Sequence, residues 1–159
     1  MSPCRALLAP LLTVVAVLGV HLPASSADEA SVALRAEAAT FLDENPGGSL
    51  EGTEVVYPDG SGFVAVAKSV SSLSQCADGR FCMWGSTNFT GSFTYVSGSG
   101  LKPLTATVKS FYNDRSYVAR LSNNAGTAST CYGPGATVAS VAATSQSPAQ
   151  VRLGVRTTC

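Results

Sequence analysis

The pattern of apolar and polar positions predicts one amphipathic helix followed by a series of short strands. Apolar residues at helical spacing form one stripe between residues 29 and 44, and the turn sequence at 45–48 ends the helix. Acidic residues at positions 28 and 29 favour the helix start through its dipole. The stripe consists of Leu34, Ala38, Phe41 and Leu42.

After the helix, the alternation changes to the two-residue period of strands. Residues 53–57 and 63–67 are predicted to form a hairpin, because the sequence between them has turn chemistry. Residues 108–112 and 117–121 are predicted as two further strands joined by 113–116. Val151, Leu153 and Val155 alternate with polar residues or glycine, which indicates a strand with one solvent-exposed face. Many short strands with glycine-rich turns predict a mainly β fold, a small antiparallel sandwich or barrel.

The first residues are typical of an export signal. Arg5 precedes an apolar run that is too short for a membrane span, and small residues at 25–27 fit a cleavage site. Cys4 lies ahead of the apolar run, whereas a lipid-anchored cysteine would follow it. We therefore expect a secreted, extracellular protein without a membrane anchor. The Ser-rich stretch at 68–75 suggests three parts: a signal peptide at 1–27, an acidic helix and hairpin at 28–72, and a β domain at 73–159.

Four cysteines remain after the signal, an even number that favours two disulfides in an oxidising compartment. Three pairings are possible from the sequence. We favour Cys76 with Cys82, because five intervening residues make a small loop, and this leaves Cys131 with Cys159.

The residue types present exclude several kinds of chemistry. The only histidine is His21, in the signal, so histidine-dependent nucleophilic triads and histidine-ligated metals have no residue to use. After residue 60 the only acidic residues are Asp78 and Asp114. We expect no enzymatic activity, no cofactor and no metal. Basic residues are not interleaved with aromatic ones, so nucleic-acid binding is not expected either.

A net charge near zero hides an asymmetry between two halves. Residues 28–59 carry eight acidic residues and only Arg35, whereas the chain from residue 60 carries eight basic and two acidic residues. We expect the halves to attract each other. The acidic helix is either an ordinary surface element or a propeptide or docking segment that covers the basic domain.

One motif is more specific than the strand pattern. Trp84, Phe89 and Gly91 match the aromatic-x4-aromatic-x-Gly signature of the βγ-crystallin Greek key, in which a folded hairpin tucks an aromatic ring against a sheet. Glycine reaches positive φ at little cost, and the two rings could close a small core. With the stretches at 76–93 and 108–121, this motif resembles the secreted actinobacterial peptidase inhibitors typified by the Streptomyces metalloproteinase inhibitor. The resemblance covers about residues 74–135.

The resemblance implies a βγ-crystallin-like Greek-key sandwich and inhibition of a secreted metallopeptidase. We expect the protein to be a monomer. That family presents its reactive bond on a loop closed by a second short-range disulfide, whereas Cys131 here has no cysteine nearby before Cys159. We assign the inhibitory loop to 128–135, around Thr130, Cys131 and Tyr132. Tyr132 is either an anchor for a peptidase pocket or an aromatic residue of the core.

Two alternative functions for the same fold stay open. The stretch 113–118 begins like a calcium loop but places Tyr117 and Val118 where hydroxyl groups belong. A secreted toxin-like or antifungal module would use the basic surface against an anionic cell surface. Neither alternative requires inhibitory activity.

Overall fold

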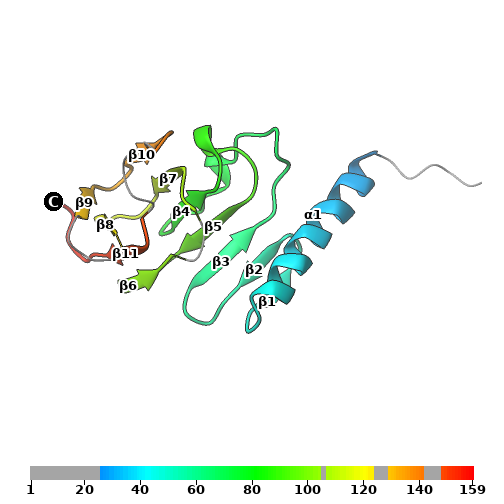
Figure 1. Cartoon of the computed structure of the whole chain (residues 1–159), viewed down its shortest axis with the longest axis horizontal. Helices are drawn as coiled ribbons and strands as arrows, with labels where there is room; N and C mark the ends of the chain where they lie inside the picture. The colour runs from blue at the N-terminus through cyan, green and yellow to red at the C-terminus, as the bar shows by residue number, and fades with distance from the viewer. Residues whose placement is uncertain (1–25, 105–106, 124–128, 142–147) are drawn as a thin grey trace, which may run out of the picture.

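The computed structural model describes residues 26–104, 107–123, 129–141 and 148–159. The predicted signal peptide therefore lies almost wholly outside the described residues. Within these residues, one helix precedes eleven short strands and two single-turn 3₁₀ helices (Figure 1). They are α1 Ser26–Glu44, β1 Ser49–Glu51, β2 Glu54–Val56, β3 Ser61–Val64, η1 Leu73–Gln75, β4 Phe81–Trp84, η2 Thr87–Phe89, β5 Phe93–Val96, β6 Gly100–Pro103, β7 Ser110–Asn113, β8 Ala119–Ser122, β9 Ser129–Tyr132, β10 Thr137–Val138 and β11 Gln150–Leu153.

The strands form two antiparallel sheets. The larger has seven strands in the order β1-β2-β3-β5-β4-β7-β10, and the smaller has four in the order β6-β11-β8-β9. This confirms the predicted mainly β fold with an N-terminal helix and a hairpin, here β2 and β3. Figure 1 shows the four-stranded sheet at one end of the molecule and α1 at the other.

Three clusters of buried side chains hold these layers together. The first lies between the two sheets and joins Phe81 and Phe111 of the large sheet to Leu121 and Val151 of the small one. The second covers the opposite face of the large sheet around Trp84. In the third, α1 packs on β2 and β3, and the ring of Phe41 stacks on Phe63 with centroids 4.2 Å apart.

The structure refines two sequence predictions. The strands predicted at 108–112 and 117–121 are β7 and β8, and they do not pair with each other, because β7 belongs to the large sheet and β8 to the small one. The chain crosses between layers in the turn at 114–118. The alternation predicted through Val155 ends at Leu153, and Val155 is 72% exposed.

Strands on both sides of residue 72 belong to one sheet. Strand β3 pairs with β5 from Ser61↔Val96 to Val64↔Phe93. The helix also contacts the later chain, because Ser92 Oγ donates a hydrogen bond to Glu37 Oε1 at 2.7 Å. The boundary at residue 72 stays a prediction, since continuous pairing does not say whether either part folds alone.

Within the described residues, no helix is both long and apolar enough to cross a membrane.

Candidate functional site

The residues predicted to form the inhibitory loop lie in β9, an edge strand of the four-stranded sheet. Thr130 pairs with Leu121 of β8, Cys131 with Arg120, and Tyr132 with Ala119. Residue 128 lies outside the described part of the chain. Residues 129–132 therefore form an extended strand rather than the expected loop, and the turn at 133–135 follows it.

A disulfide joins this edge strand to the last residues of the chain. Cys131 and Cys159 are bonded across 28 positions, with their Cα atoms 5.9 Å apart. Two backbone hydrogen bonds also hold the segment after β11 to Val118. Gly154 N donates to the Val118 carbonyl, and Val118 N donates to the carbonyl of Arg156. The C-terminal segment is thus fixed at both ends beside β8 and β9.

The side chain of Tyr132 faces the core. Its ring meets the ring of Phe111 edge to face, with centroids 4.6 Å apart and planes at 71°. It packs against the cluster between the sheets and is only partly exposed. This arrangement matches the alternative in which Tyr132 is a core aromatic, because an anchor for a partner pocket would have to leave this contact.

A buried asparagine fixes the end of β9 to the turn after it. Asn113 is fully buried, and its Nδ2 lies within 3.2 Å of the carbonyl oxygens of Tyr117, Tyr132 and Gly133. Its Oδ1 is buried without a hydrogen-bond partner. Because a buried amide bonded to three separate backbone positions cannot shift alone, Asn113 locks the turn at 113–118 to β9.

The next residues of that turn are engaged in ways that do not suit a calcium site. Tyr112 donates its hydroxyl to Asp114 Oδ1 at 2.7 Å, and this hydrogen bond raises the pKa of Tyr112. Arg115 is 6% exposed, and its guanidinium donates to the carbonyl oxygens of Gly98, Val118 and Gly154. Burial lowers the pKa of Arg115. A buried cation is thus already hydrogen-bonded to the carbonyl groups around this turn.

The described residues contain no group of three acidic, cysteine or histidine side chains that could hold a metal ion.

A second constrained segment is the loop closed by Cys76 and Cys82, whose Cα atoms are 6.0 Å apart. This is the pairing that the sequence favoured. Gly79 N donates to the carbonyl of Asp114 at 2.8 Å, and Asp114 N donates to the carbonyl of Arg80 at 3.0 Å. Residues 77–79 are exposed, so the loop is short, rigid and accessible. The sequence predicted an architectural role for the Cys76–Cys82 loop and gave no sign that the tip of the loop would lie beside the 113–118 turn.

The aromatic signature forms a packed unit beneath this loop. The rings of Trp84 and Phe89 meet edge to face with centroids 5.4 Å apart, and Gly91 has a φ of +76°. Trp84 is fully buried, and its Nε1 donates to Ser72 Oγ at 2.6 Å. Ser72 Oγ in turn donates to the carbonyl of Gly91 at 2.8 Å. Sequence analysis missed Ser72, because a lone serine in a Ser-rich stretch carries no pattern.

Polar contacts join the acidic segment to the rest of the chain, as the charge asymmetry predicted. One centre is Glu54, whose Oε1 lies 2.8 Å from Arg80 Nη2 and accepts the hydroxyl of Tyr95 at 2.6 Å. The Arg80 guanidinium lies 3.8 Å from the centre of the Tyr95 ring. Burial and the hydrogen bond to Glu54 raise the pKa of Tyr95 well above its usual range.

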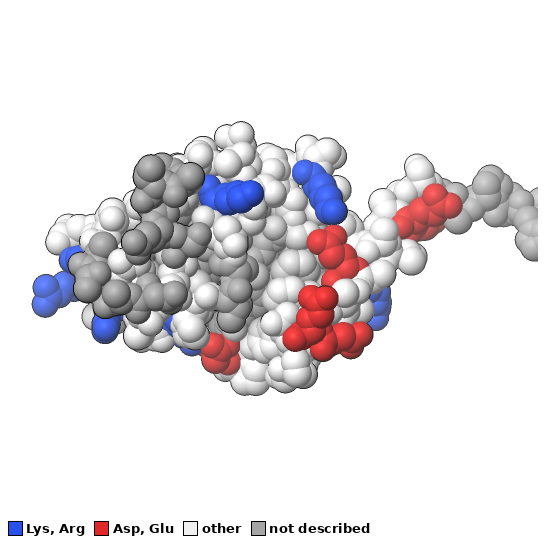
Figure 2. Space-filling model, viewed as in Figure 1, with Lys and Arg blue, Asp and Glu red and all other residues white. Residues whose placement is uncertain are grey.

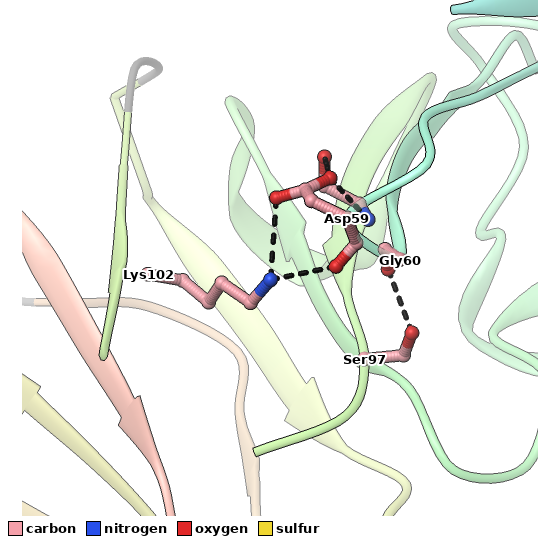
Figure 3. A network of polar contacts seen from close by, with 5 residues as sticks. Asp59, Gly60, Ser97 and Lys102 are labelled. Atoms are coloured by element: carbon pink, nitrogen blue, oxygen red, sulfur yellow. Dashed lines mark hydrogen bonds and ion pairs between the residues drawn. The ribbon is translucent and has the colours of Figure 1, made fainter. Parts of the chain in front are cut away.

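The second centre is the turn between β2 and β3 (Figure 3). Lys102 Nζ lies 3.2 Å from Asp59 Oδ2 and donates to the Asp59 carbonyl at 2.6 Å. Ser97 Oγ donates to the carbonyl of Gly60 at 2.7 Å. Hydrogen bonds from Ser61, and to a smaller extent the contact with Lys102, hold the pKa of Asp59 below its usual range.

Comparison with known proteins gives one match. Residues 71–133, less than half of the chain, match the model of peptidase inhibitor family I36. This confirms the resemblance to a peptidase inhibitor family and indicates a non-enzymatic protein with a peptidase inhibitor role. The matched segment contains the Cys76–Cys82 loop, the aromatic signature and all of β9. No curated protein and no solved structure matches the chain.

Proposed function

We propose that this protein is a secreted, monomeric inhibitor of an extracellular metallopeptidase. The family match over residues 71–133 carries the inhibitor role. The metallopeptidase target is supported by the resemblance of the stretches at 76–93 and 108–121 to secreted metalloproteinase inhibitors. Export is supported by the apolar run near the N-terminus and by two disulfides, which persist in oxidising compartments.

The proposed fold family is the βγ-crystallin Greek key. The support is the geometry of the signature: Trp84 and Phe89 pack edge to face, and Gly91 takes the left-handed conformation that other residues resist. The same contacts give these residues an architectural role, so the surface that meets a peptidase lies elsewhere.

We place the peptidase contact at β9 and the turn at 133–135. Peptidases bind extended chains, and an exposed edge strand offers unpaired backbone groups to such a cleft. Ser129 and Thr130 are exposed, and among the described strands β9 has a neighbour on only one side. The ring of Tyr132 supports the strand from the core side. Thr130 and Cys131 are the proposed contact residues, with Tyr132 as their support.

Rigidity makes this segment suitable for inhibition. A bound loop that is already ordered loses little conformational entropy, and a cleaved product held in place does not leave readily. The disulfide at Cys131 and the Asn113 hydrogen bonds to Tyr132 and Gly133 hold β9 at both faces. The Cys76–Cys82 loop is equally constrained, so experiment must separate the two segments.

The test is turnover of a peptide substrate by thermolysin-type and subtilisin-type peptidases, with and without residues 28–159. We expect the first class to be inhibited. Thr130→Lys places a charge on the proposed contact strand and should weaken inhibition, whereas Thr137→Lys places the same charge on β10, an edge strand of the other sheet. Asp78→Ala probes the Cys76–Cys82 loop. Absence of inhibition at micromolar protein contradicts the proposed function, and loss only with Asp78→Ala moves the contact to that loop.

The calcium alternative loses support from the contacts of Asp114 and Arg115 described above. A rise in melting temperature on adding calcium would restore it. The toxin-like alternative stays a prediction, and growth inhibition of fungi or bacteria by the protein is its test.

A further inference from the structure

The outer face of the four-stranded sheet carries two neighbouring arginines that the inhibitor role does not explain. Strand pairing places Leu101, Arg152, Arg120 and Cys131 directly beside one another across β6, β11, β8 and β9. Arg120 and Arg152 are therefore cross-strand neighbours, and both are exposed. Like charges in directly opposite positions destabilise a sheet, so this pair has a cost.

The C-terminal segment turns the row into a hollow. Residues 154–159 run from β11 toward β9, where the Cys131–Cys159 disulfide holds their end. The result is a cavity of about 290 Å³ whose lining includes Arg120, Arg152 and Arg156. Arg156 is held in place because its carbonyl accepts a hydrogen bond from Val118 N at 2.8 Å.

The three arginines have no carboxylate partner within the described chain. The ion pairs found there join Arg80 to Glu54 and Lys102 to Asp59, and none involves the hollow. In the view of Figure 2, most of the red atoms lie on or beside α1, whereas blue atoms occur both there and at the opposite end of the molecule. Three guanidinium groups in one hollow suit oxyanions, since each can bind a carboxylate through two parallel hydrogen bonds.

The hollow also exposes apolar surface. Val155 lines it and is 72% exposed, and Leu101 at the end of the row is 47% exposed. A small inorganic anion would use the arginines and leave these side chains in water. A peptide segment with acidic and apolar side chains would use both, so the combination favours a peptide.

We propose that the Arg120–Arg152–Arg156 hollow is a docking site for an acidic segment of the target peptidase. This docking site rests on the proposed function, and it adds a second contact with the peptidase to the one at β9. The hollow borders β9, because Arg120 pairs with Cys131 and the lining residue Cys159 is bonded to Cys131. A peptidase that holds β9 in its cleft would therefore place a neighbouring segment over the arginines. Charge attraction there would speed association and set target preference.

A direct binding experiment tests the site without any peptidase. The probe is a fluorescein-labelled, glutamate-rich peptide that contains leucine, and its binding to residues 28–159 is followed by fluorescence anisotropy. We expect Arg120→Ala/Arg152→Ala to weaken binding by about tenfold, which corresponds to two exposed ion pairs, and to flatten its salt dependence. The matched control, Lys68→Ala/Lys109→Ala, removes two exposed positive charges elsewhere and should change binding by less than about twofold.

Thermal unfolding keeps the result interpretable. Because the two arginines repel each other in the free protein, each single alanine variant should melt at the same temperature as the parent protein or higher. Weaker binding with unchanged or higher melting temperature supports the proposal. Equal weakening in both double variants, or displacement of the peptide by inorganic sulfate as readily as by unlabelled peptide, overturns it.

Inhibition assays with the same variants separate this proposal from the proposed function. If the parent protein inhibits a metallopeptidase and the arginine variant inhibits it equally well, the docking site is wrong and the inhibitor role stands. If peptide binding depends on the arginines but no peptidase is inhibited, the hollow is a site for acidic peptides and the inhibitor role is wrong.

Discussion

The prediction that follows most directly from the structure concerns Arg115, the buried cation in the turn between the two sheets. Its guanidinium joins three separate segments through their carbonyl oxygens, at Gly98 after β5, Val118 before β8 and Gly154 after β11. Replacement by methionine keeps most of the apolar stem and removes the charge and all three hydrogen bonds. Arg115→Met therefore isolates the polar contacts from the packing.

The magnitude is the balance of two opposing terms. Hydrogen bonds from a charged donor contribute about 1.5 to 3 kcal/mol each, and the carbonyl groups left behind would be partly buried. Against this, methionine relieves the cost of holding a cation at 6% exposure. With two of the three contacts long, at 3.3 Å, we expect a net loss of about 2 to 4 kcal/mol in the free energy of unfolding. Such a loss lowers the melting temperature by roughly 10 °C in a domain of this size.

The assay is equilibrium unfolding in urea with both disulfides intact, followed by tryptophan fluorescence, since Trp84 is the only tryptophan. Arg120→Met is the matched control, because its side chain is exposed and the change should stay within about 0.5 kcal/mol. If the free energy of unfolding of Arg115→Met fell by less than about 1 kcal/mol or rose, the cost of burying the guanidinium would match or exceed the gain from its three carbonyl contacts. The view that Arg115 fastens the sheets together would then be wrong.

Two further predictions concern backbone and charge. Gly91→Ala should cost about 1 to 2 kcal/mol through its left-handed backbone alone, because an added Cβ would make only ordinary contacts, with Lys68 Cα at 3.5 Å and the Lys68 carbonyl oxygen at 4.0 Å. Urea unfolding of Gly85→Ala, a glycine outside the left-handed region, should show little change, and equal losses in both variants would refute this reason. Because folding lowers the pKa of Asp59, its ionised carboxylate stabilises the fold at a pH above the unfolded pKa of about 3.9. This stabilisation is lost as the pH falls through the lower pKa of the folded state. The melting temperature of Asp59→Asn should therefore fall less than that of the parent protein between about pH 4 and pH 2, and parallel curves would contradict this.

The features that the sequence predicted well are local ones. Helix α1 follows from a stripe of side chains a few positions apart, and the aromatic signature places Trp84 and Phe89 within one turn of chain. Gly91 was predicted at positive φ, and it lies there. In each case the residues that decide the structure are neighbours in the chain, so spacing alone carries the information.

The features that it missed depend on partners far away in the chain. Alternation says which face of a strand is buried but not which strand lies beside it, so the sequence predicted both strands without showing that β7 and β8 belong to different sheets. At the end of β7 and in the turn after it lie Asn113 and Arg115, two buried polar side chains that composition alone places on the surface. Their partners lie in segments after β5, β9 and β11, and no short-range pattern identifies those partners.

The same geometry explains how far the attraction between the acidic and basic halves reaches. Glu54 and Asp59 neutralise Arg80 and Lys102, the basic side chains beside β2 and its turn to β3. Helix α1 lies at one end of the molecule and the four-stranded sheet at the other (Figure 1), so the acidic side chains of α1 are remote from the arginines of that sheet. Exposed charges more than about 8 Å apart are largely screened in physiological salt. Neutralisation within the chain therefore ends before the arginine-lined hollow, and the charge there stays available to an acidic partner.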